Sequence, residues 1–179
     1  KIRYINNSQF NSTDMVYSAL LGLKNTKKDT IISYTDIVYS KKIFKIFSSN
    51  SKKFITVPYI KNWKQIWKKR NKSIFRDAET FHVDIHSNLR EIGNKINKKN
   101  LKYINGQFMG IIFIPSGLIQ KTINKYKAYK NKRLQFTEFI NKLIKDNIKV
   151  KCLEYKDFWY EIDDIQDYKN FKKLKKIRY

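Results

Sequence analysis

The sequence predicts an α/β protein in which helices cover both faces of a mixed sheet. Short apolar runs rich in β-branched residues alternate along the whole chain with segments of helical spacing, which is typical of α/β sheets. A turn at Ser87-Asn88 joins two of the runs as a hairpin and favours a mixed sheet over a purely parallel one. The 179 residues contain no linker or low-complexity segment, so we expect a single domain over residues 1–179.

Composition and charge narrow the class of protein. With 41% hydrophobic and 15% aromatic residues, the chain is expected to fold as a globule rather than to remain disordered. Its formal net charge of +24 would suit nucleic acid or another polyanion, including a phosphate-rich small substrate. The lysines are spread over the whole chain instead of gathering in one strip, so nucleic acid is the less favoured partner.

Cysteine usage and hydropathy indicate a cytoplasmic protein. Cys152 is the only cysteine, so no internal disulfide is expected, and its apolar neighbours suggest that it is a small core residue. No Cys/His spacing indicates zinc, no apolar run is long enough to span a membrane, and no signal peptide is visible. The oligomeric state is not determined by the sequence, and a homodimer stays open.

The first half of the chain is expected to alternate strands and helices. Residues 1–7 look extended, and Ser12, Thr13 or Asp14 can cap a helix that closes near Gly22. The segments that follow are a strand over 31–40, a helix over 41–50, a strand over 52–59 that Pro58 stops, a helix over 62–70 and a hairpin within 74–93.

The second half continues the same alternation. Residues 108–114 form the most strand-like run of the chain, apolar enough to be central in the sheet, and Gly106 and Gly110 lie close to its start. The remaining segments are amphipathic helices over 118–129 and 134–144, a strand over 148–155 and a closing helix over 164–174.

Two groups of side chains allow both a structural and a functional interpretation. Trp63 and Trp67 share one helical face, and together with Trp159 they could line a cage for an ammonium group through cation–π contacts. Core packing is the favoured interpretation for each tryptophan. Two histidines flank Asp84 on one face of the expected hairpin and could be drawn as a metal site, but the polar face of a hairpin is the better account.

Two acids stand out because each follows a predicted strand. Asp36 lies in the run IISYTDIVYS, and Asp163 lies in the acidic stretch YEIDDIQDY near the other end of the chain. Open α/β sheets place ligand chemistry at the carboxyl ends of strands, where acids far apart in sequence can meet. Carboxylate oxygens suit Mg²⁺, whose other ligands are then water and substrate phosphate. Spacing alone equally allows Asp36 to cap a turn.

Six motifs occur in order along the chain: FNSTDMVYSALL, SYTDIVY, DAETF, EIG, GQFMG and WYEIDDIQDY. Each is modest alone, but in this order they resemble small-molecule nucleotidyltransferases of the phosphocholine cytidylyltransferase kind. The resemblance is strongest to the branch associated with phosphonate metabolism, which often accompanies phosphoenolpyruvate mutase. It covers nearly all of the chain, and Asp14 stands where the family usually has Asn.

This resemblance implies a Rossmann-like, GT-A-like nucleotidyltransferase fold that binds CTP or another nucleoside triphosphate. The family joins the nucleoside monophosphate to a small phosphate or phosphonate, such as phosphocholine or aminoethylphosphonate, and releases pyrophosphate. Its metal aspartates fall on Asp36 and Asp163, which are the implied catalytic residues and Mg²⁺ ligands. The candidate substrate-binding residues are Glu79, Gln107, Trp159 and Glu161.

The chain departs from the family at its start. The family begins with a strand and a glycine-rich loop whose backbone N–H groups cradle the triphosphate. The glycines of this chain are not spaced as such a loop; they are Gly22, Gly93, Gly106, Gly110 and Gly117. We therefore expect a domain without its N-terminal strand and loop, either because a sequence that begins at Lys1 is truncated or because the protein is degenerate. Such a chain should bind nucleoside triphosphate poorly.

The leading functional prediction is a CTP-dependent cytidylyltransferase that transfers CMP to a small phosphonate or phosphorylated acceptor. One alternative is a sugar-1-phosphate nucleotidyltransferase on the same fold, which nucleotide and acceptor preference would distinguish. Another is a non-catalytic protein, either a degenerate nucleotidyltransferase or a basic nucleic-acid-binding module. The acceptor itself is not identified by the sequence.

Overall fold

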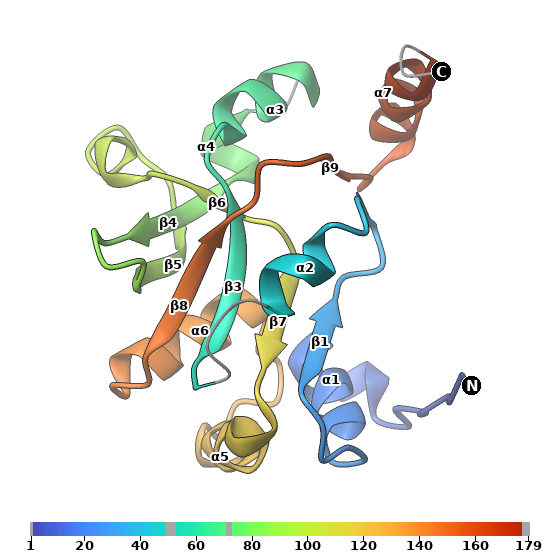
Figure 1. Cartoon of the computed structure of the whole chain (residues 1–179), viewed down its shortest axis with the longest axis vertical. Coiled ribbons are helices and arrows are strands. Elements are labelled where there is room, and N and C mark those ends of the chain that lie inside the picture. The colour runs from blue at the N-terminus through green and yellow to red at the C-terminus, as the bar shows by residue number, and fades with distance from the viewer. Residues whose placement is uncertain (1, 49–52, 71–72, 177–179) are drawn as a thin grey trace.

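The computed structural model describes residues 2–48, 53–70 and 73–176 (Figure 1). The helices are α1 (Met15–Leu23), α2 (Ile43–Ser48), α3 (Trp63–Arg70), α4 (Ile74–Asp77), α5 (Ser116–Ala128), α6 (Phe136–Lys145) and α7 (Ile165–Lys176). The strands are β1 (Thr30–Ser33), β2 (Ile37–Tyr39), β3 (Ile55–Ile60), β4 (Glu79–Val83), β5 (Leu89–Lys95), β6 (Gln107–Phe108), β7 (Ile111–Ile114), β8 (Val150–Glu154) and β9 (Trp159–Glu161). Short 3₁₀ turns cover Phe10–Ser12 and Leu101–Tyr103.

The main sheet is mixed, as the sequence predicted. β7 lies between β1 and β3 and runs antiparallel to both, whereas β8 pairs with β3 in parallel. β6 pairs with the end of β3, where Tyr59 lies opposite Phe108. Parallel and antiparallel pairs therefore occur in one sheet, and the ends of β1 and β3 point the same way.

Helices cover both faces of this sheet, each over its own apolar core (Figure 1). On one face, α1, α5 and α6 contribute buried side chains such as Leu20, Ile123 and Phe139. On the other face, α2 and α3 contribute Phe47 and the two tryptophans of α3. Successive residues of a strand point to opposite faces, and β7 accordingly supplies both cores by turns. The predicted α/β architecture with helices on both faces is confirmed.

Two small antiparallel sheets flank the main one. β4 and β5 form the predicted hairpin, whose turn is built on Asp84: its carboxylate accepts hydrogen bonds from the backbone N–H groups of His86 and Asn88. Ser87 has a positive φ of 59°, as a tight turn requires. β2 pairs with β9, a ladder that joins the first and last thirds of the chain. This second pair positions the candidate site.

Two expected strands in the N-terminal part were wrong. Residues 31–40 are not one strand: β1 ends at Ser33 and β2 begins at Ile37, because the two pair with different partners, β7 and β9. The extended segment expected at 1–7 forms no strand over its described residues, where Ile2 and Tyr4 are largely exposed. Asp14, one of the three expected caps, does cap α1, since its carboxylate accepts the Met15 N–H at 2.7 Å.

Two features of the central strands also differ from expectation. Pro58 does not stop β3, which continues to Ile60. On this side of β3, Thr56 pairs with β7 and Tyr59 pairs with β6. Pro58, which lacks an N–H, falls between these two pairs. The run 108–114 is divided into β6 and β7 at Gly110, which has a φ of +75°. A Cβ there would lie 3.0 Å from the Tyr34 ring.

Other expectations from composition agree with the structure. Cys152 is buried in the core between its neighbours on β8, as a small apolar residue would be. None of the helices in the described segments combines the length and the apolar character that crossing a bilayer needs.

Candidate active site

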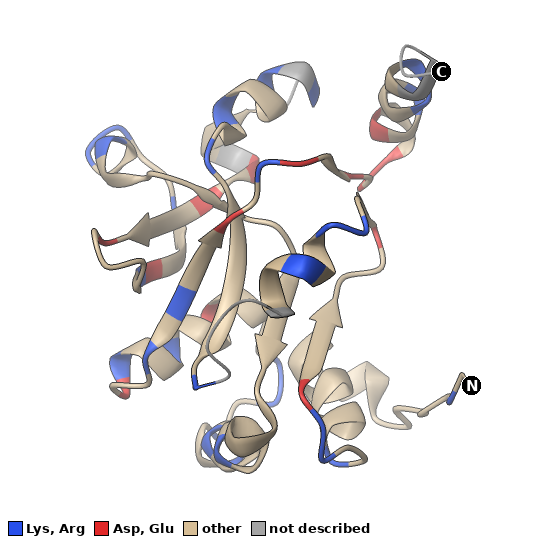
Figure 2. Cartoon of the chain, viewed as in Figure 1, with Lys and Arg blue, Asp and Glu red and all other residues tan. Residues whose placement is uncertain are grey.

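The β2–β9 ladder brings together the two acids that the sequence singled out. Ile37 lies opposite Glu161, and one step further the N–H of Ile162 donates to the carbonyl oxygen of Asp36 at 2.8 Å. Asp36 and Asp163 therefore sit at the same end of this ladder, one on each chain segment. Figure 2 shows acidic residues on the β1–β2 connection, along β9 and at the start of α7, whereas lysines and arginines lie mainly on helices, including α7, and in loops.

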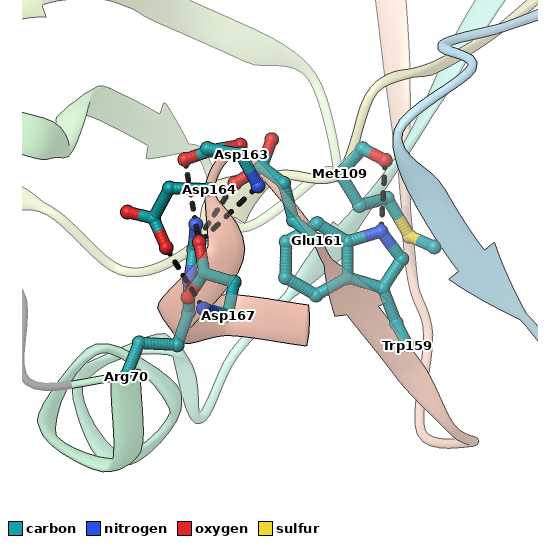
Figure 3. Close-up of polar contacts among 7 residues, drawn as sticks. All are labelled: Arg70, Met109, Trp159, Glu161, Asp163, Asp164 and Asp167. Atoms are coloured by element: carbon teal, nitrogen blue, oxygen red, sulfur yellow. Dashed lines mark hydrogen bonds and ion pairs between the residues drawn. The ribbon is translucent and has the colours of Figure 1, made fainter. Parts of the chain in front are cut away.

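Arg70, at the end of α3, lies at the centre of this acidic end (Figure 3). Its Nη1 donates to Glu161 at 2.8 Å and its Nη2 donates to Asp163 at 2.7 Å. Its Nε and Nη2 both donate to Asp167, at 3.1 and 2.9 Å. The Arg70 side chain is fully buried, and the Trp67 ring lies against its guanidinium group, with 5.2 Å between them. One cation thus joins three carboxylates, from β9, from α7 and from the segment between them.

Charge and burial shift the ionisation of this group. Burial, together with the nearby charges of Asp163 and Asp36, raises the pKa of Glu161 to about 7. Arg70 opposes this rise through its charge and its hydrogen bond. Burial lowers the pKa of Arg70, but the bonds to its carboxylates outweigh burial, so the net shift is upward and the guanidinium stays charged.

The carboxylates at this end could hold Mg²⁺ as a pair of ligands. Among the described residues, no three acid, histidine or cysteine side chains lie close enough to form a metal cage of protein ligands. Mg²⁺ is commonly held by one or two carboxylates, with water and substrate phosphates completing its octahedron. Asp36 and Asp163 could supply such a pair of carboxylates, with Arg70 fixing Oδ2 of Asp163.

Tyr34 connects the acidic end to Glu79. Its N–H donates to Gly110 at 2.9 Å, and its ring packs edge-on against Phe108 with centroids 5.9 Å apart. Burial raises the pKa of the Tyr34 hydroxyl, and the charges of Glu79 and Glu161 raise it further. The hydroxyl therefore stays protonated in a surrounding of carboxylates, among which Asp36 and Asp14 also act on it. The sequence did not single out this tyrosine.

Gln107 is buried, and Glu79 is half-buried. Glu79 begins β4, and burial raises its pKa against the effect of a hydrogen bond with Thr137. Gln107 is only 6% exposed on β6, and the described part of the chain offers no hydrogen-bond partner to its buried Oε1. A buried amide oxygen without a partner is costly and is available to a donor from a ligand or water. Their substrate-binding role stays a prediction.

The three tryptophans form a packed layer. Trp63 and Trp67 meet edge-to-face, and Trp67 stacks on Trp159 at 6.4 Å between ring centroids. All three are almost completely buried, and Nε1 of Trp159 donates to the Met109 carbonyl at 3.0 Å (Figure 3). Core packing, the favoured interpretation, is confirmed for these rings. A contact of Trp159 with substrate stays a prediction.

The metal site that could be drawn on the β4–β5 hairpin is replaced by a turn. Asp84 accepts from the backbone at two positions and from Asn88 Nδ2, and Arg90 completes the shell at 2.7 Å. Its carboxylate is therefore committed to the turn and to Arg90, as the polar-face interpretation expected.

Sequence reasoning missed Arg70 and Asp167. The partners of Arg70 lie more than 90 positions away, so no local spacing reveals them. A weak signal did exist: Arg70 is one of six arginines among 39 basic residues and follows Trp67 by three positions on an apolar helix face. A planar guanidinium where most cations are lysines indicates a site that needs several directed bonds.

The sequence of the chain is similar to that of a known enzyme. No protein-family model matches the chain. It is 28% identical over 176 residues to a CTP:phosphoglutamine cytidylyltransferase of Campylobacter jejuni subsp. jejuni serotype O:2, covering 90% of this chain and 68% of that protein.

Solved structures give the same picture. The inositol-1-phosphate CTP transferase from T. maritima superposes with a TM-score of 0.72 at 17% identity, over 96% of this chain and 66% of that one. The CTP:phosphocholine cytidylyltransferase from Streptococcus pneumoniae superposes with a TM-score of 0.64 at 15% identity, over 97% of this chain and 68% of that one. The chain thus spans about two thirds of the length of the proteins that it matches. It has the Rossmann-like fold of the nucleotidyltransferases, and its sequence is similar to that of a small-molecule cytidylyltransferase.

Proposed function

We propose that the protein is a CTP-dependent cytidylyltransferase that transfers CMP to the phosphate group of a small acceptor and releases pyrophosphate. The observation that supports this most is the meeting of Asp36 and Asp163 at the end of the β2–β9 ladder, in a chain with a nucleotidyltransferase fold. The proteins that it resembles are named for CTP and for phosphoglutamine, inositol 1-phosphate or phosphocholine as partners. These acceptors share one feature, a phosphate on a small molecule.

The reaction is a single displacement at phosphorus. An oxygen of the acceptor phosphate attacks the α-phosphorus of CTP and forms a new P–O bond. The bond from that phosphorus to the oxygen bridging to the β-phosphate breaks, and its electron pair leaves with pyrophosphate. No proton needs to be removed from an ionised phosphate, so the protein contributes mainly position and charge compensation.

The acidic residues support a role for a divalent cation. Glu161, Asp163 and Asp36 would repel the triphosphate of CTP, and the buried charge of Arg70 is already shared among three carboxylates. When bound to Asp36 and Asp163, Mg²⁺ would neutralise the triphosphate and the departing pyrophosphate. The carboxylates of this chain orient the cation, and Arg70 keeps one oxygen of Asp163 in place.

Acceptor recognition is assigned to the side of the site near Tyr34. Glu79 presents a half-buried carboxylate there, and Gln107 has a buried amide oxygen that no described group satisfies. Both groups accept hydrogen bonds, so they suit an acceptor that carries N–H or O–H donors in addition to its phosphate. We propose Glu79 and Gln107 as acceptor contacts and leave Trp159 as support for the loop at Met109.

The test is Mg²⁺-dependent release of pyrophosphate from CTP by the full-length protein. The acceptor panel contains phosphoglutamine, phosphocholine, inositol 1-phosphate, aminoethylphosphonate and a sugar 1-phosphate. We expect release with one class of acceptor, reduced on the order of 100-fold or more in Asp36→Ala and Asp163→Ala, because the cation loses a ligand.

The matched control is Asp146→Ala, which removes another ion-paired aspartate. Asp146 binds Lys125 Nζ and the Tyr129 hydroxyl, each at 2.7 Å, at the far end of α6. Its loss should leave turnover within about twofold of wild type. Absence of release with every acceptor, from a folded full-length protein, would refute the proposed activity for this panel.

A further inference from the structure

At the acidic end of the site, one guanidinium group bonds to several carboxylates. Arg70 makes four hydrogen bonds to three carboxylates, all between 2.7 and 3.1 Å (Figure 3). The geometry of a guanidinium is planar and rigid, so bonds made from one side fix the direction of the bonds on the other side.

One side of this fork is an anchor. Asp167 is 0% exposed and receives two bonds from Arg70. Its Oδ2 also accepts the backbone N–H of Asp163 at 3.2 Å, and its own N–H donates to Asp164 Oδ1 at 2.8 Å. Asp167 is therefore held by a side chain, by the backbone of β9's extension and by the first turn of α7. A carboxylate fixed in this way can fix the guanidinium in turn.

The other side of the fork faces the site. Glu161 and Asp163 each receive a single bond from Arg70, and their side chains are 22% and 37% exposed. They stand beside Asp36 through the β2–β9 ladder. Asp167 alone would suffice as the partner of a purely structural ion pair. The two further bonds of Arg70 instead hold the side chains of Glu161 and Asp163, which border the ladder end.

We propose that Arg70 is a positioning residue, anchored on Asp167, that holds Asp163, with Glu161 beside it, where Asp163 and Asp36 can meet a divalent cation. This proposal rests on the function proposed above. Without the fork, Asp163 would lose the bond that fixes its Oδ2, and the pair of carboxylates that it forms with Asp36 would lose its orientation. Arg70 itself touches neither cation nor substrate.

The decisive variant is Arg70→Lys in the full-length protein. Lysine keeps the positive charge, so its repulsion of a cation is unchanged, but its single ammonium group cannot make four directed bonds to three carboxylates. Removal of a residue that orients metal ligands typically weakens metal binding 10- to 100-fold. We expect the dissociation constant for Mn²⁺, measured on the metal alone by electron paramagnetic resonance, to rise about tenfold or more.

The matched control is Arg90→Lys. Arg90 also pairs with an aspartate, Asp84, through two nitrogens at 2.7 and 2.6 Å, but it lies on the β4–β5 hairpin and is 58% exposed. Its substitution should leave Mn²⁺ binding unchanged. In turnover, Arg70→Lys should lower kcat while KM for the acceptor stays within about twofold, because the acceptor contacts are not altered.

A second measurement needs no variant. In the wild-type protein, the Nη2–H resonances of Arg70 should shift in the NMR spectrum when Mg²⁺ is added, since Nη2 donates to Asp163, which is shared with the cation, whereas the guanidinium resonances of Arg90 should not. An unchanged Arg70 resonance at saturating Mg²⁺ would overturn the proposal even if Arg70→Lys failed to fold.

The outcomes separate this proposal from the proposed function. If no acceptor supports pyrophosphate release but Mn²⁺ binding depends on Arg70, the activity is wrong and the positioning role stands. If the wild type releases pyrophosphate and Arg70→Lys binds Mn²⁺ as tightly as the wild type, the positioning role is overturned and the activity stands. Undetectable Mn²⁺ binding by the folded wild type would overturn the positioning role as well.

Discussion

Two regions of the molecule are each built on an arginine and an aspartate, and they differ in almost every other respect. At the acidic end of the site, buried Arg70 is shared by three carboxylates. In the hairpin, Asp84 pairs with exposed Arg90 and also accepts bonds from the turn backbone. The hairpin is balanced, with one acid for one cation and its acceptors filled. At the site, one buried cation is shared by several acids.

This difference separates a structural ion pair from a candidate ligand site. A balanced and partly exposed pair contributes little to stability and has no need of a further ion. A buried arginine bonded to several carboxylates is costly to assemble, and this one holds Asp163 beside the ladder end. Each of the following predictions uses one region as the reference for the other.

The largest expected effect is on stability at the anchor. Asp167→Ala removes two of the four bonds that compensate a buried guanidinium, and breaking a buried ion pair from one side typically costs about 3–5 kcal/mol. Urea unfolding should show a decrease of about that size in the free energy of unfolding. A decrease below about 1 kcal/mol would show that Glu161 and Asp163 alone compensate the charge of Arg70. Asp167 would then not be the anchor of the guanidinium.

The second prediction is that the two regions respond to pH in opposite directions. The pKa of Glu161 in the folded protein is raised to about 7 from an ordinary value of 4.5, so its protonated form is favoured by folding. Its contribution to stability is fully present below pH 4.5 and is lost as the pH rises through about 7. For a group that is 22% exposed, this amounts to about 1–3 kcal/mol.

Asp84 behaves in the reverse manner. Burial raises its pKa, but the hydrogen bonds from Asn88, Arg90 and His86 outweigh burial and hold it below the ordinary value of 3.8. Its stabilisation is present above that value and is lost as the pH falls through the lower pKa of the folded state. The free energy of unfolding should be measured from pH 3 to 8 in metal-free buffer. Its decrease toward pH 7 should be lost in Glu161→Gln, and its decrease toward pH 3 should be lost in Asp84→Asn. Equal slopes in wild type and Glu161→Gln would contradict the assignment.

The same comparison shows what the sequence could predict. Elements with strong local patterns were predicted, including α6 with its apolar stripe and the central strand that becomes β7. The acids Asp36 and Asp163 were predicted to meet because each follows a strand, a rule that needs no knowledge of side-chain contacts. The turn at Asp84 is equally local, since its partners lie within six positions.

What could not be predicted depends on contacts between distant segments. The bonds of Arg70 to Glu161 and Asp167 span more than 90 positions, and an ion pair produces no periodicity in the sequence. Pro58 continues its strand only because the neighbouring ladder is interrupted at that level, which pairing alone determines. For Pro58, tertiary pairing overrules the local propensity of proline to end a strand. For Arg70, the sequence near the residue carries no signal of its partners.

The smallest expected effect tests the balanced region. Arg90→Ala should lower the free energy of unfolding by about 1 kcal/mol or less, because the side chain is 58% exposed and solvent screens its charge. Asp84 keeps its bonds from Asn88 and from the His86 N–H, so the turn remains closed without the arginine. The difference from wild type should shrink further in 1 M salt, measured by urea unfolding at both salt concentrations. A loss above about 2 kcal/mol that persists in salt would mean that the hairpin pair is as deeply coupled as the Arg70 cluster. Burial would then no longer explain why one arginine organises a site and the other only pairs with a turn residue at the surface.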